Sequence, residues 1–404
     1  AVPLQPPDEL APPEPGATWV MTETTGFRLH YITQSAADRD LLPILDAAGE
    51  AYQDISGRMG DSAEEVDIYL LDRVIGQGGY ASSDWVAVSY TDRRYSPVEI
   101  DTLFRHELVH HLDEALDCDG APAMMREGLA VYLAGGHYRR ESLRDKAAAI
   151  ISTPHQIPLG ELVVDFYTHQ HEVAYLEAGA LVQYLVDRYG WDALEPMCQA
   201  ASERDGDETE RWHAALGAVD IASAHELETR WRTWLSDGAG SMDGALLELE
   251  LRLMELMRAY QEAYDPAAHF IEGLLFSPAE AERMEIVANF VRRPREPEAL
   301  ALEMVLALAQ EAVEQPDVVL LGSLIEELDA ALTTGVESTD LIRQLRDVSV
   351  LALAQGYEPY RVLLEDSNRY RIYVLDRQSW PQQAVLTATR SGYVWQLSGQ
   401  PASE

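Results

Sequence analysis

Apolar and polar residues alternate in three short segments near the start of the chain, which is typical of strands with one buried face. These segments are 27–32, 66–70 and 85–89. Between the first two, apolar residues recur at helical spacing over 38–59. The pattern therefore predicts a sheet over 19–95 with one helix inserted in its sequence.

From position 97 the periodicity becomes helical and stays so to about 235, interrupted by glycine and proline turns. The segment 236–240, Ser-Asp-Gly-Ala-Gly, is the best candidate for a linker. About five amphipathic helices follow up to 355, then three or four strands up to 397. We expect an α+β protein, in which an N-terminal mixed sheet packs on a largely helical domain. A helical domain with a small antiparallel sheet follows. The expected units are a flexible proline-rich segment (1–17), a first domain (18–237) and a second domain (245–404).

The size and charge of the chain limit its architecture and its partners. With 404 residues it is too long for one ordinary core and suits two or three domains. The 69 Asp and Glu residues outnumber the 30 Lys and Arg residues, which gives a formal net charge of −39. Such a field repels phosphates, so nucleic acids and anionic membranes are unfavourable partners. The sequence has no run of about 20 apolar residues, so no transmembrane segment is expected.

Two features bear on where the protein works. Residues 1–16 include six prolines and cannot form a core, so they are expected to be a flexible spacer. We interpret the spacer as what remains after removal of a signal segment, which favours a secreted or cell-surface protein. A stalk behind a lipid anchor fits equally well, as does an artificially trimmed start. Cys118 and Cys198 are either one disulfide or two small buried residues.

The clearest chemical signal is the segment 103–112, Leu-Phe-Arg-His-Glu-Leu-Val-His-His-Leu. His106 and His110 are four residues apart, so on a helix they project from one face, one turn apart. Two imidazoles so placed can fill adjacent corners of a tetrahedral zinc site. Glu107 lies beside that face, where its carboxylate reaches a water on the metal rather than the metal itself. This is the HExxH pattern, and its alternative is an amphipathic helix with histidines at its margin.

A catalytic zinc needs a third protein ligand and one open position. After a turn at 117–120, residues 122–134 are helical in pattern and are followed by two glycines. If this second helix folds back on the first, Glu127 lies opposite the two histidines. The alternative for Glu127 is a solvated helix charge, which agrees less well with Gly128 and the apolar run after it. The pattern therefore predicts zinc held by His106, His110 and Glu127.

The segments HELVH and REGLAVY together resemble the gluzincin family of zinc metallopeptidases, whose familiar members are thermolysin and the aminopeptidase N-like enzymes. The segment 174–182 is similar to the YxxGA segment of the aminopeptidase N-like enzymes, which implies that the Tyr175 hydroxyl stabilises the tetrahedral intermediate. The segments 183–190 and 225–235 are also similar to those of compact bacterial peptidase-MA-like domains. The resemblance covers about residues 18–237 and implies a metallopeptidase domain there.

The chain departs from two related patterns. Asp113 stands where metzincins have a glycine, and no third histidine follows at metzincin spacing, so metzincins are excluded. The region 77–83 lacks the acidic motif with which aminopeptidases hold a free amino terminus. The choice between endopeptidase and aminopeptidase therefore stays open.

The expected reaction is hydrolysis of a bond in a peptide or protein substrate. Zinc would lower the pKa of its bound water to about 7, Glu107 would be the general base, and Tyr175 would stabilise the oxyanion. His169 and His171 are rivals for the last role, because another gluzincin branch uses a histidine; otherwise they are ordinary exposed residues. The strand at 85–89 is the expected edge for pairing with an extended substrate.

Residues 245–404 show no metal-ligand spacing, no glycine-rich phosphate loop and no nucleophile elbow, so we interpret them as an accessory domain. Two other functions remain open for the whole chain. It is alternatively a catalytically weak or inactive metallopeptidase-like module that binds a partner or a surface polymer, or a zinc hydrolase that acts on something other than a peptide.

Overall fold

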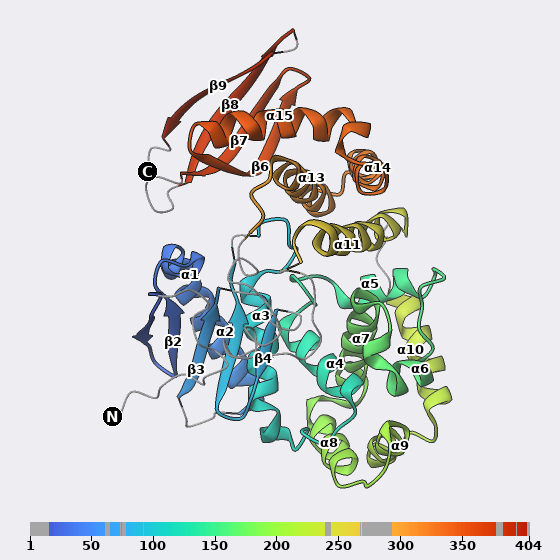
Figure 1. Cartoon of the computed structure of the whole chain (residues 1–404). Coiled ribbons are helices and arrows are strands. Elements are labelled where there is room, and N and C mark those ends of the chain that lie inside the picture. The colour runs from blue at the N-terminus through green and yellow to red at the C-terminus, as the bar shows by residue number, and fades with distance from the viewer. Residues whose placement is uncertain are drawn as a thin grey trace.

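The computed structural model describes residues 16–60, 65–72, 74, 78–91, 93–238, 244–266, 268, 293–376, 383–392 and 394–401. The chain is a mixed α and β protein with one sheet near each end of the sequence (Figure 1). The predicted proline-rich spacer lies outside the described residues except at its last positions. Among the described helices, none combines the length and the apolar character that crossing a membrane requires.

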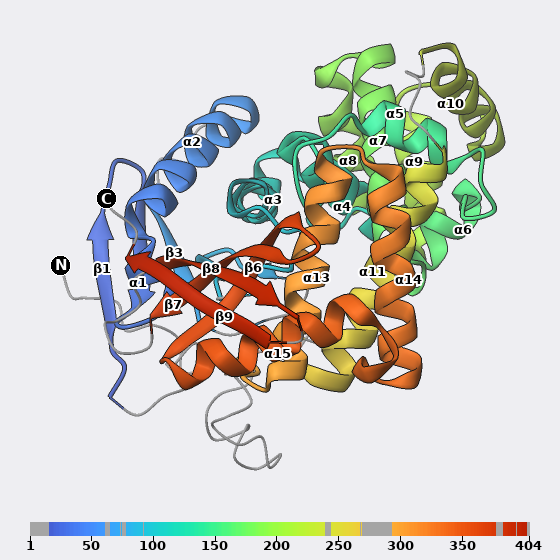
Figure 2. The same ribbon diagram turned by 90° about the horizontal axis from the view of Figure 1, so that it is seen from above.

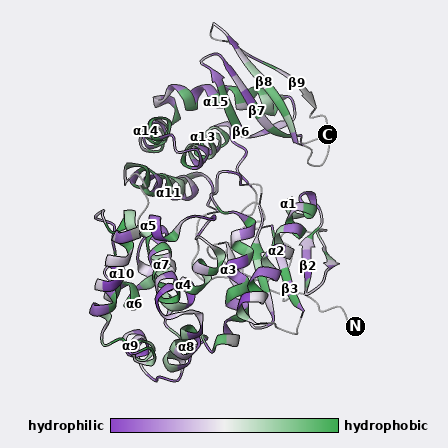
Figure 3. Cartoon of the chain, turned by 180° about the vertical axis from the view of Figure 1, so that it is seen from behind, coloured by the Kyte–Doolittle hydropathy of each residue, from purple (hydrophilic) through white to green (hydrophobic). Residues whose placement is uncertain are grey.

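The N-terminal sheet is mixed, with the strand order β1-β2-β3-β5-β4. Its strands are β1 (Trp19–Glu23), β2 (Phe27–Ile32), β3 (Val66–Leu71), β4 (Gly79–Ala81) and β5 (Trp85–Ser89). β2, β3 and β5 are parallel, while β1 and β4 pair antiparallel at the two edges. β3 is central, largely hydrophobic (Figure 3) and buried along its whole length. The mixed sheet and its three predicted strands are therefore confirmed.

The predicted edge strand is wrong. β5 pairs on its outer side with β4, so β4 takes the edge position. The chain reverses between the two strands and runs back along β5, and the Ser89 N–H donates to the Gly78 carbonyl at 2.7 Å. Gly78 has a φ of 121°, a conformation that favours glycine. The three-residue length of β4 leaves too little alternation for a strand to be predicted there.

Two helices cover one face of this sheet. α2 (Leu41–Met59) and α3 (Ile100–Leu112) lie side by side and share a hydrophobic core with the inward residues of the strands. The short α1 (Ala36–Arg39) precedes α2. On the opposite face Tyr69, Leu71 and Ala87 form a smaller cluster, against which Trp19 and Trp85 pack. The first core continues from the sheet through α3 into the helical part of the molecule.

The helical part is built around α7 (His171–Tyr189), which packs along α4 (Ala123–Ala134). Glycines let these two helices approach closely. A Cβ added at Gly128 would lie 2.7 Å from the Ala178 carbonyl oxygen, and one at Gly179 would lie 2.5 Å from Val131 Cγ1. The other elements of this part are η2 (Asp113–Leu116), α5 (Leu143–Ile150), α6 (Leu159–Val164), η3 (Phe166–Thr168), α8 (Leu194–Ser202), α9 (Glu208–Ala218) and α10 (Ala224–Gly238).

Two open points of the sequence are settled here. Cys118 and Cys198 form a disulfide, which ties the turn before α4 to α8. The predicted linker at 236–240 is wrong for 236–238, which are helical up to the end of α10 at Gly238, and its positions 239 and 240 lie outside the described residues. The local signal for a linker was the glycines, but α10 is amphipathic and buries Leu235 in the first core, which extends the helix.

The C-terminal part contains helices and an antiparallel sheet with the order β6-β7-β8-β9 (Figure 1). Three or four strands were predicted here, and the structure has four. α13 and α15 pack against this sheet, and α14 packs on α13 and α11. The elements are α11 (Gly244–Tyr264), α13 (Pro297–Glu314), α14 (Val318–Thr334), α15 (Asp340–Ala354), β6 (Tyr357–Asp366), β7 (Arg369–Asp376), β8 (Gln383–Ser391) and β9 (Val394–Pro401).

α11 joins the two cores. Leu247 and Leu251 belong to the first hydrophobic core, while Met254 and Tyr260 belong to the second. Seen from above, α11 runs beneath α13 and α14 toward the helical part of the first core (Figure 2). The first helix after the expected domain boundary at 237–245 contributes residues to both hydrophobic cores. These contacts do not separate the two expected domains, so the boundary stays a prediction.

The burial of Glu177 on α7 leads us to expect that the stability of the protein depends on pH. Its side chain is fully buried, and one oxygen accepts from the Ile157 N–H at 3.2 Å. The other oxygen is buried without a hydrogen-bond partner among the described residues. Burial raises the pKa of this carboxyl from 4.5 to about 8, so the folded protein holds a proton that the unfolded chain releases.

We expect the melting temperature to fall between pH 4.5 and about 8, the window set by those two pKa values. Within this pH window, the proton that the unfolded Glu177 releases lowers the unfolding free energy by about 1.4 kcal/mol for each pH unit. Glu177→Gln keeps the shape but cannot ionise, so its melting temperature should change less over the same window. Scanning calorimetry of both proteins between pH 5 and 9 tests this, and equally steep curves would contradict it.

Candidate metal centre

α3 is held firmly against its neighbours, which fixes the side chains that it carries. Arg105 is buried and pairs with Asp101 on the same helix and with Asp54 on α2. His111 Nδ1 contacts the Ser82 carbonyl oxygen at 2.8 Å, which links α3 to the β4–β5 hairpin. At the end of α3, Asp113 accepts from Arg126 on α4 at 2.9 Å. The two helices are therefore fixed to one another next to the HExxH segment.

The structure brings the three predicted metal ligands together. His106 Nε2 and His110 Nε2 are 3.1 Å apart. Glu127 Oε2 lies 3.2 Å from His106 Nε2 and 3.3 Å from His110 Nε2. Among the described residues this is the one group of three His, Cys, Asp or Glu side chains whose ligand atoms converge in this way. We name these three residues the ligand triangle.

The ligand triangle fits zinc in both chemistry and spacing. Two imidazole nitrogens and one carboxylate oxygen are donors that zinc accepts, and three protein ligands leave a fourth position open. A regular tetrahedron with bonds of 2.0–2.1 Å has edges of about 3.3 Å, close to the sides of the triangle. One feature is incomplete: His110 Nδ1 is buried and finds no partner in the described part of the chain. In zinc sites that nitrogen usually donates to an acceptor.

Tyr167 on η3 contacts the ligand triangle from outside. Its hydroxyl donates to Glu127 Oε1 at 2.8 Å, so both carboxylate oxygens of Glu127 are engaged. Burial opposes ionisation of Glu127, but His110 and His106 outweigh it and hold the pKa of this carboxyl well below its usual range. The carboxylate is therefore charged and oriented, as a metal ligand requires.

Tyr167→Phe is expected to weaken zinc binding by about 10- to 100-fold, because partners that orient a ligand contribute that much. The side chain is 53% exposed, so the substitution removes a hydroxyl without opening a core. Competition with a chromophoric chelator measures the affinity. Tyr80→Phe on β4 is the matched control, since Tyr80 is also exposed and its ring packs on Trp85. Equal affinities of the two variants would show that the Tyr167 hydroxyl does not support the ligand.

Glu107 lies beside the ligand triangle and close to the edge strand. A Cβ added at Gly79 would lie 2.3 Å from Glu107 Oε1, so any larger residue there would displace this carboxylate. The side chain is 6% exposed. Burial raises the pKa of the Glu107 carboxyl to about 7, with His106 lowering it and Glu127 raising it further. Glu107 is thus a carboxyl next to the metal position that is not itself part of the ligand triangle.

Tyr175, the predicted oxyanion donor, lies in an aromatic wall beside the ligand triangle. Its ring centroid is 6.1 Å from that of His106, 4.4 Å from that of His137 and 4.1 Å from that of His171. Burial raises the pKa of Tyr175 well above its usual value, so the phenol keeps its proton. The side chain can therefore act as a hydrogen-bond donor.

His171 belongs to the same wall and to a polar network. His171 Nδ1 is 2.8 Å from His137 Nε2 and 3.2 Å from the Tyr138 hydroxyl, which in turn donates to Glu172 at 3.0 Å. Burial lowers the pKa of His171 to about 3, with Arg258 contributing, so the ring is neutral. The reading of His169 and His171 as ordinary exposed residues is wrong, since both are partly buried and line a cleft.

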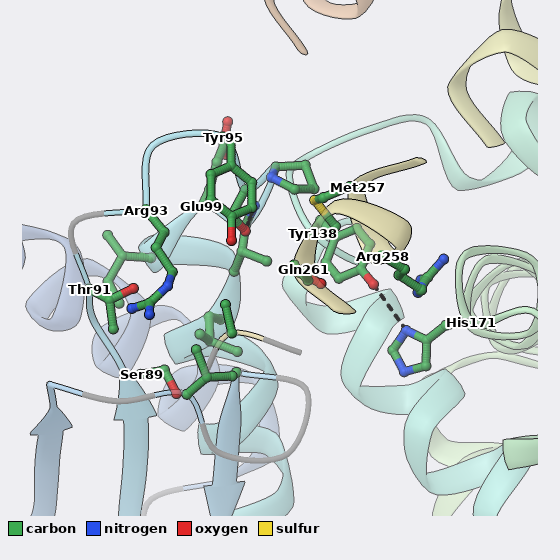
Figure 4. A pocket seen from close by; sticks show the side chains of 18 of the residues that line it. Ser89, Thr91, Arg93, Tyr95, Glu99, Tyr138, His171, Met257, Arg258 and Gln261 are labelled. Carbon is green, nitrogen blue, oxygen red and sulfur yellow. Dashed lines mark hydrogen bonds between the residues drawn. The ribbon is translucent and has the colours of Figure 1, made fainter. Parts of the chain in front are cut away.

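A cleft of about 980 Å³ opens beside the ligand triangle. It is lined by residues between 89 and 103, by Tyr138, by residues 167–171 and by side chains of α11 (Figure 4). Leu103, one turn before His106 on α3, is among them, as is Tyr167, which contacts Glu127. The cleft therefore lies next to the ligand triangle on the side of η3 and the N-terminus of α3, although the three ligands themselves do not line it.

Several residues of this site were not predicted. Tyr167, His137, Tyr138 and Arg258 carry no motif, although His137 directly follows the glycines that end α4. The Tyr167 to His171 segment is polar and aromatic between two apolar helices, which is the one local signal of a functional loop. No model of a known protein family matches this chain, and comparison with curated proteins finds no relative.

Proposed function

We propose that this protein is a zinc metallopeptidase of the gluzincin type. The observation that carries the proposal is the ligand triangle: two histidine nitrogens and a glutamate oxygen from two helices, 3.1–3.3 Å apart, with Glu107 beside them. A largely buried cluster of this composition next to a large cleft supports a catalytic role over a purely structural one. The resemblance of the sequence to the gluzincin motifs supports the same class.

In the proposed reaction, His106, His110 and Glu127 hold zinc. Zinc, when bound, supplies a Lewis acid that polarises the scissile carbonyl and makes water a stronger acid. Glu107 accepts the proton of the attacking water as a carbon–oxygen bond forms. It then delivers that proton to the leaving nitrogen as the carbon–nitrogen bond breaks. Burial of Glu107 and its contact with β4 hold the carboxylate in one place for both transfers.

The substrate is proposed to lie along β4. As the last strand of the sheet, β4 presents backbone groups on its outer side that can pair with an extended peptide. Gly79 places this edge directly over Glu107. An extended segment there passes the ligand triangle and continues into the cleft, which suits a peptide or protein substrate.

Tyr175→Phe is expected to lower kcat by about 100-fold if the Tyr175 hydroxyl donates to the oxyanion. Removal of one such donor raises the barrier without changing ground-state binding, so KM should change little. His171→Gln, a change in the neighbouring ring of the same wall, is the comparison variant. Kinetics with a quenched fluorescent peptide measure both. A large loss in His171→Gln with an unchanged kcat in Tyr175→Phe would assign the role to His171.

We further propose that the protein acts outside the cytoplasm. The Cys118–Cys198 disulfide supports this, because disulfides persist in oxidising compartments. Zinc-dependent turnover of denatured casein by the purified protein tests the main proposal. Activity should disappear with a zinc chelator and return when zinc is added back. A fully zinc-loaded protein that cleaves neither casein nor a mixed peptide library would instead favour a binding module or another hydrolase.

A further inference from the structure

We infer that α11, which follows the peptidase-like part of the sequence, forms a wall of the substrate cleft, where Met257 selects a substrate side chain and Gln261 binds the substrate main chain. The inference rests on the proposed function and gives the C-terminal part of the chain a role in it. The ligand is an extended polypeptide whose side chain at this wall is uncharged and apolar.

The cleft is built from parts that are far apart in the sequence. One side consists of the loop between β5 and α3, including Arg93, Tyr95 and Glu99. The facing side consists of Tyr138 and His171 together with Met257 and other residues of α11 (Figure 4). The α11 residues lie next to the polar network that continues into the aromatic wall of Tyr175. A substrate that lies in this cleft beside the ligand triangle therefore meets α11.

Partly buried ion pairs fix α11 to the peptidase-like part. Arg258 pairs with Glu172 at the start of α7, and the same carboxylate accepts from Tyr138. Nearer the start of α11, Glu250 pairs with Lys146 and with Arg139, the latter at 2.7 Å. These pairs lie on two successive stretches of one helix, so α11 is fixed along its length and presents a rigid wall.

The residue after α11 fixes the opposite wall of the cleft. Asp265 receives two hydrogen bonds from Arg93, at 2.7 and 2.9 Å, and one from the Tyr95 hydroxyl at 2.7 Å. Arg93 and Asp265 are both buried, so separating them would leave an unpaired charge inside the protein. The loop that carries Arg93 and Tyr95 is thereby held by the C-terminal part of the chain.

The chemistry of the α11 wall is neutral. Its one cation, Arg258, is paired with Glu172. Met257 and Gln261 are four residues apart, so they project from the same side of the helix. The Gln261 side chain makes no hydrogen bond within the described part of the chain, which leaves its amide to donate to and accept from a peptide main chain. Met257 offers a flexible apolar surface for a neighbouring side chain.

The test compares wild type with Met257→Ala and Gln261→Ala in cleavage of a mixed peptide library, with cleavage sites read by mass spectrometry. Met257→Ala should lose the apolar preference at one substrate position, Gln261→Ala should weaken cleavage at all positions alike, and kcat/KM for preferred peptides should fall by about tenfold or more in both. Zinc content should not change. Glu262→Ala is the matched control, because Glu262 is the exposed neighbour of Gln261 on α11 and is not among the cleft residues. An unchanged cleavage profile in both variants, with active wild type, would overturn the inference and leave the proposed function intact.

A binding measurement separates this inference from the proposed activity. A fluorescein-labelled tryptic digest of casein is titrated with Glu107→Gln protein, with and without Gln261→Ala and Met257→Ala, and anisotropy is recorded. Weaker binding in the double and triple variants supports the α11 wall even if wild type cleaves nothing. Binding that is equal in all of them, or absent, contradicts the wall as a site for polypeptide.

Discussion

Glu107→Gln is expected to reduce kcat by about 1,000-fold while the protein still binds about one zinc ion per chain. Glutamine has nearly the same shape as glutamate but cannot accept a proton from the attacking water. Its amide also fits a site in which burial already disfavours the charged form. Because Glu107 is not a member of the ligand triangle, the metal should remain. Peptide hydrolysis rates and zinc content by mass spectrometry give the two readouts.

Glu99→Gln is the matched control for this experiment. Glu99 directly precedes α3 and lines the cleft, and its substitution makes the same chemical change as Glu107→Gln. Glu99 lies about two helical turns from the ligand triangle. This variant should keep zinc and most of kcat, and because Glu99 lines the cleft any loss should appear in KM. If Glu107→Gln turned over substrate as fast as Glu99→Gln, Glu107 would not be the general base. If Glu107→Gln lost zinc, the carboxylate would be a ligand rather than a base.

The ligand triangle was accessible to prediction because its geometry is local. His106 and His110 need only one helix, and the fourfold spacing fixes their relative direction. Glu127 needs one further assumption, that the next helix folds back after a short turn. The glycine stop at Gly135, with a φ of 80°, and the disulfided turn before α4 both favour that arrangement. For such a site, periodicity and helix boundaries carry most of the information.

The rest of the site could not be predicted, since it depends on contacts between distant segments. Tyr167 reaches Glu127 from 40 positions away, and it lies on a three-residue helix that has no periodicity to detect. Arg258 meets Glu172 from 86 positions away, across the expected domain boundary. A hydrophobic pattern indicates which face of α11 is buried but not which surface covers it. The edge strand β4 was not predicted because it has only three residues. It matters to the site because Gly79 brings it over Glu107.

His110→Ala is expected to abolish stoichiometric zinc binding and to reduce peptide hydrolysis to the background rate. Two of the three ligands would remain, and two protein ligands are too few to hold zinc in a tetrahedral site. Glu127 Oε2 would also lose a contact of 3.3 Å, although Tyr167 would still hold its other oxygen. Added zinc stabilises a protein that binds it only in the folded state, so zinc should raise the melting temperature of wild type but not of His110→Ala.

His111→Ala separates this effect from a general loss of stability. The two histidines are neighbours on α3, but His111 points to the β4–β5 hairpin and contacts the Ser82 carbonyl. Removing that hydrogen bond should lower the melting temperature by a few degrees in the absence of zinc. The variant should nevertheless bind zinc and show the same zinc-induced rise as wild type. If both variants kept about one zinc ion per chain, the metal would be held elsewhere, and the proposed reaction would lose its central group. If both lost it, the binding of zinc would depend on the packing of α3 as a whole rather than on the ligand triangle.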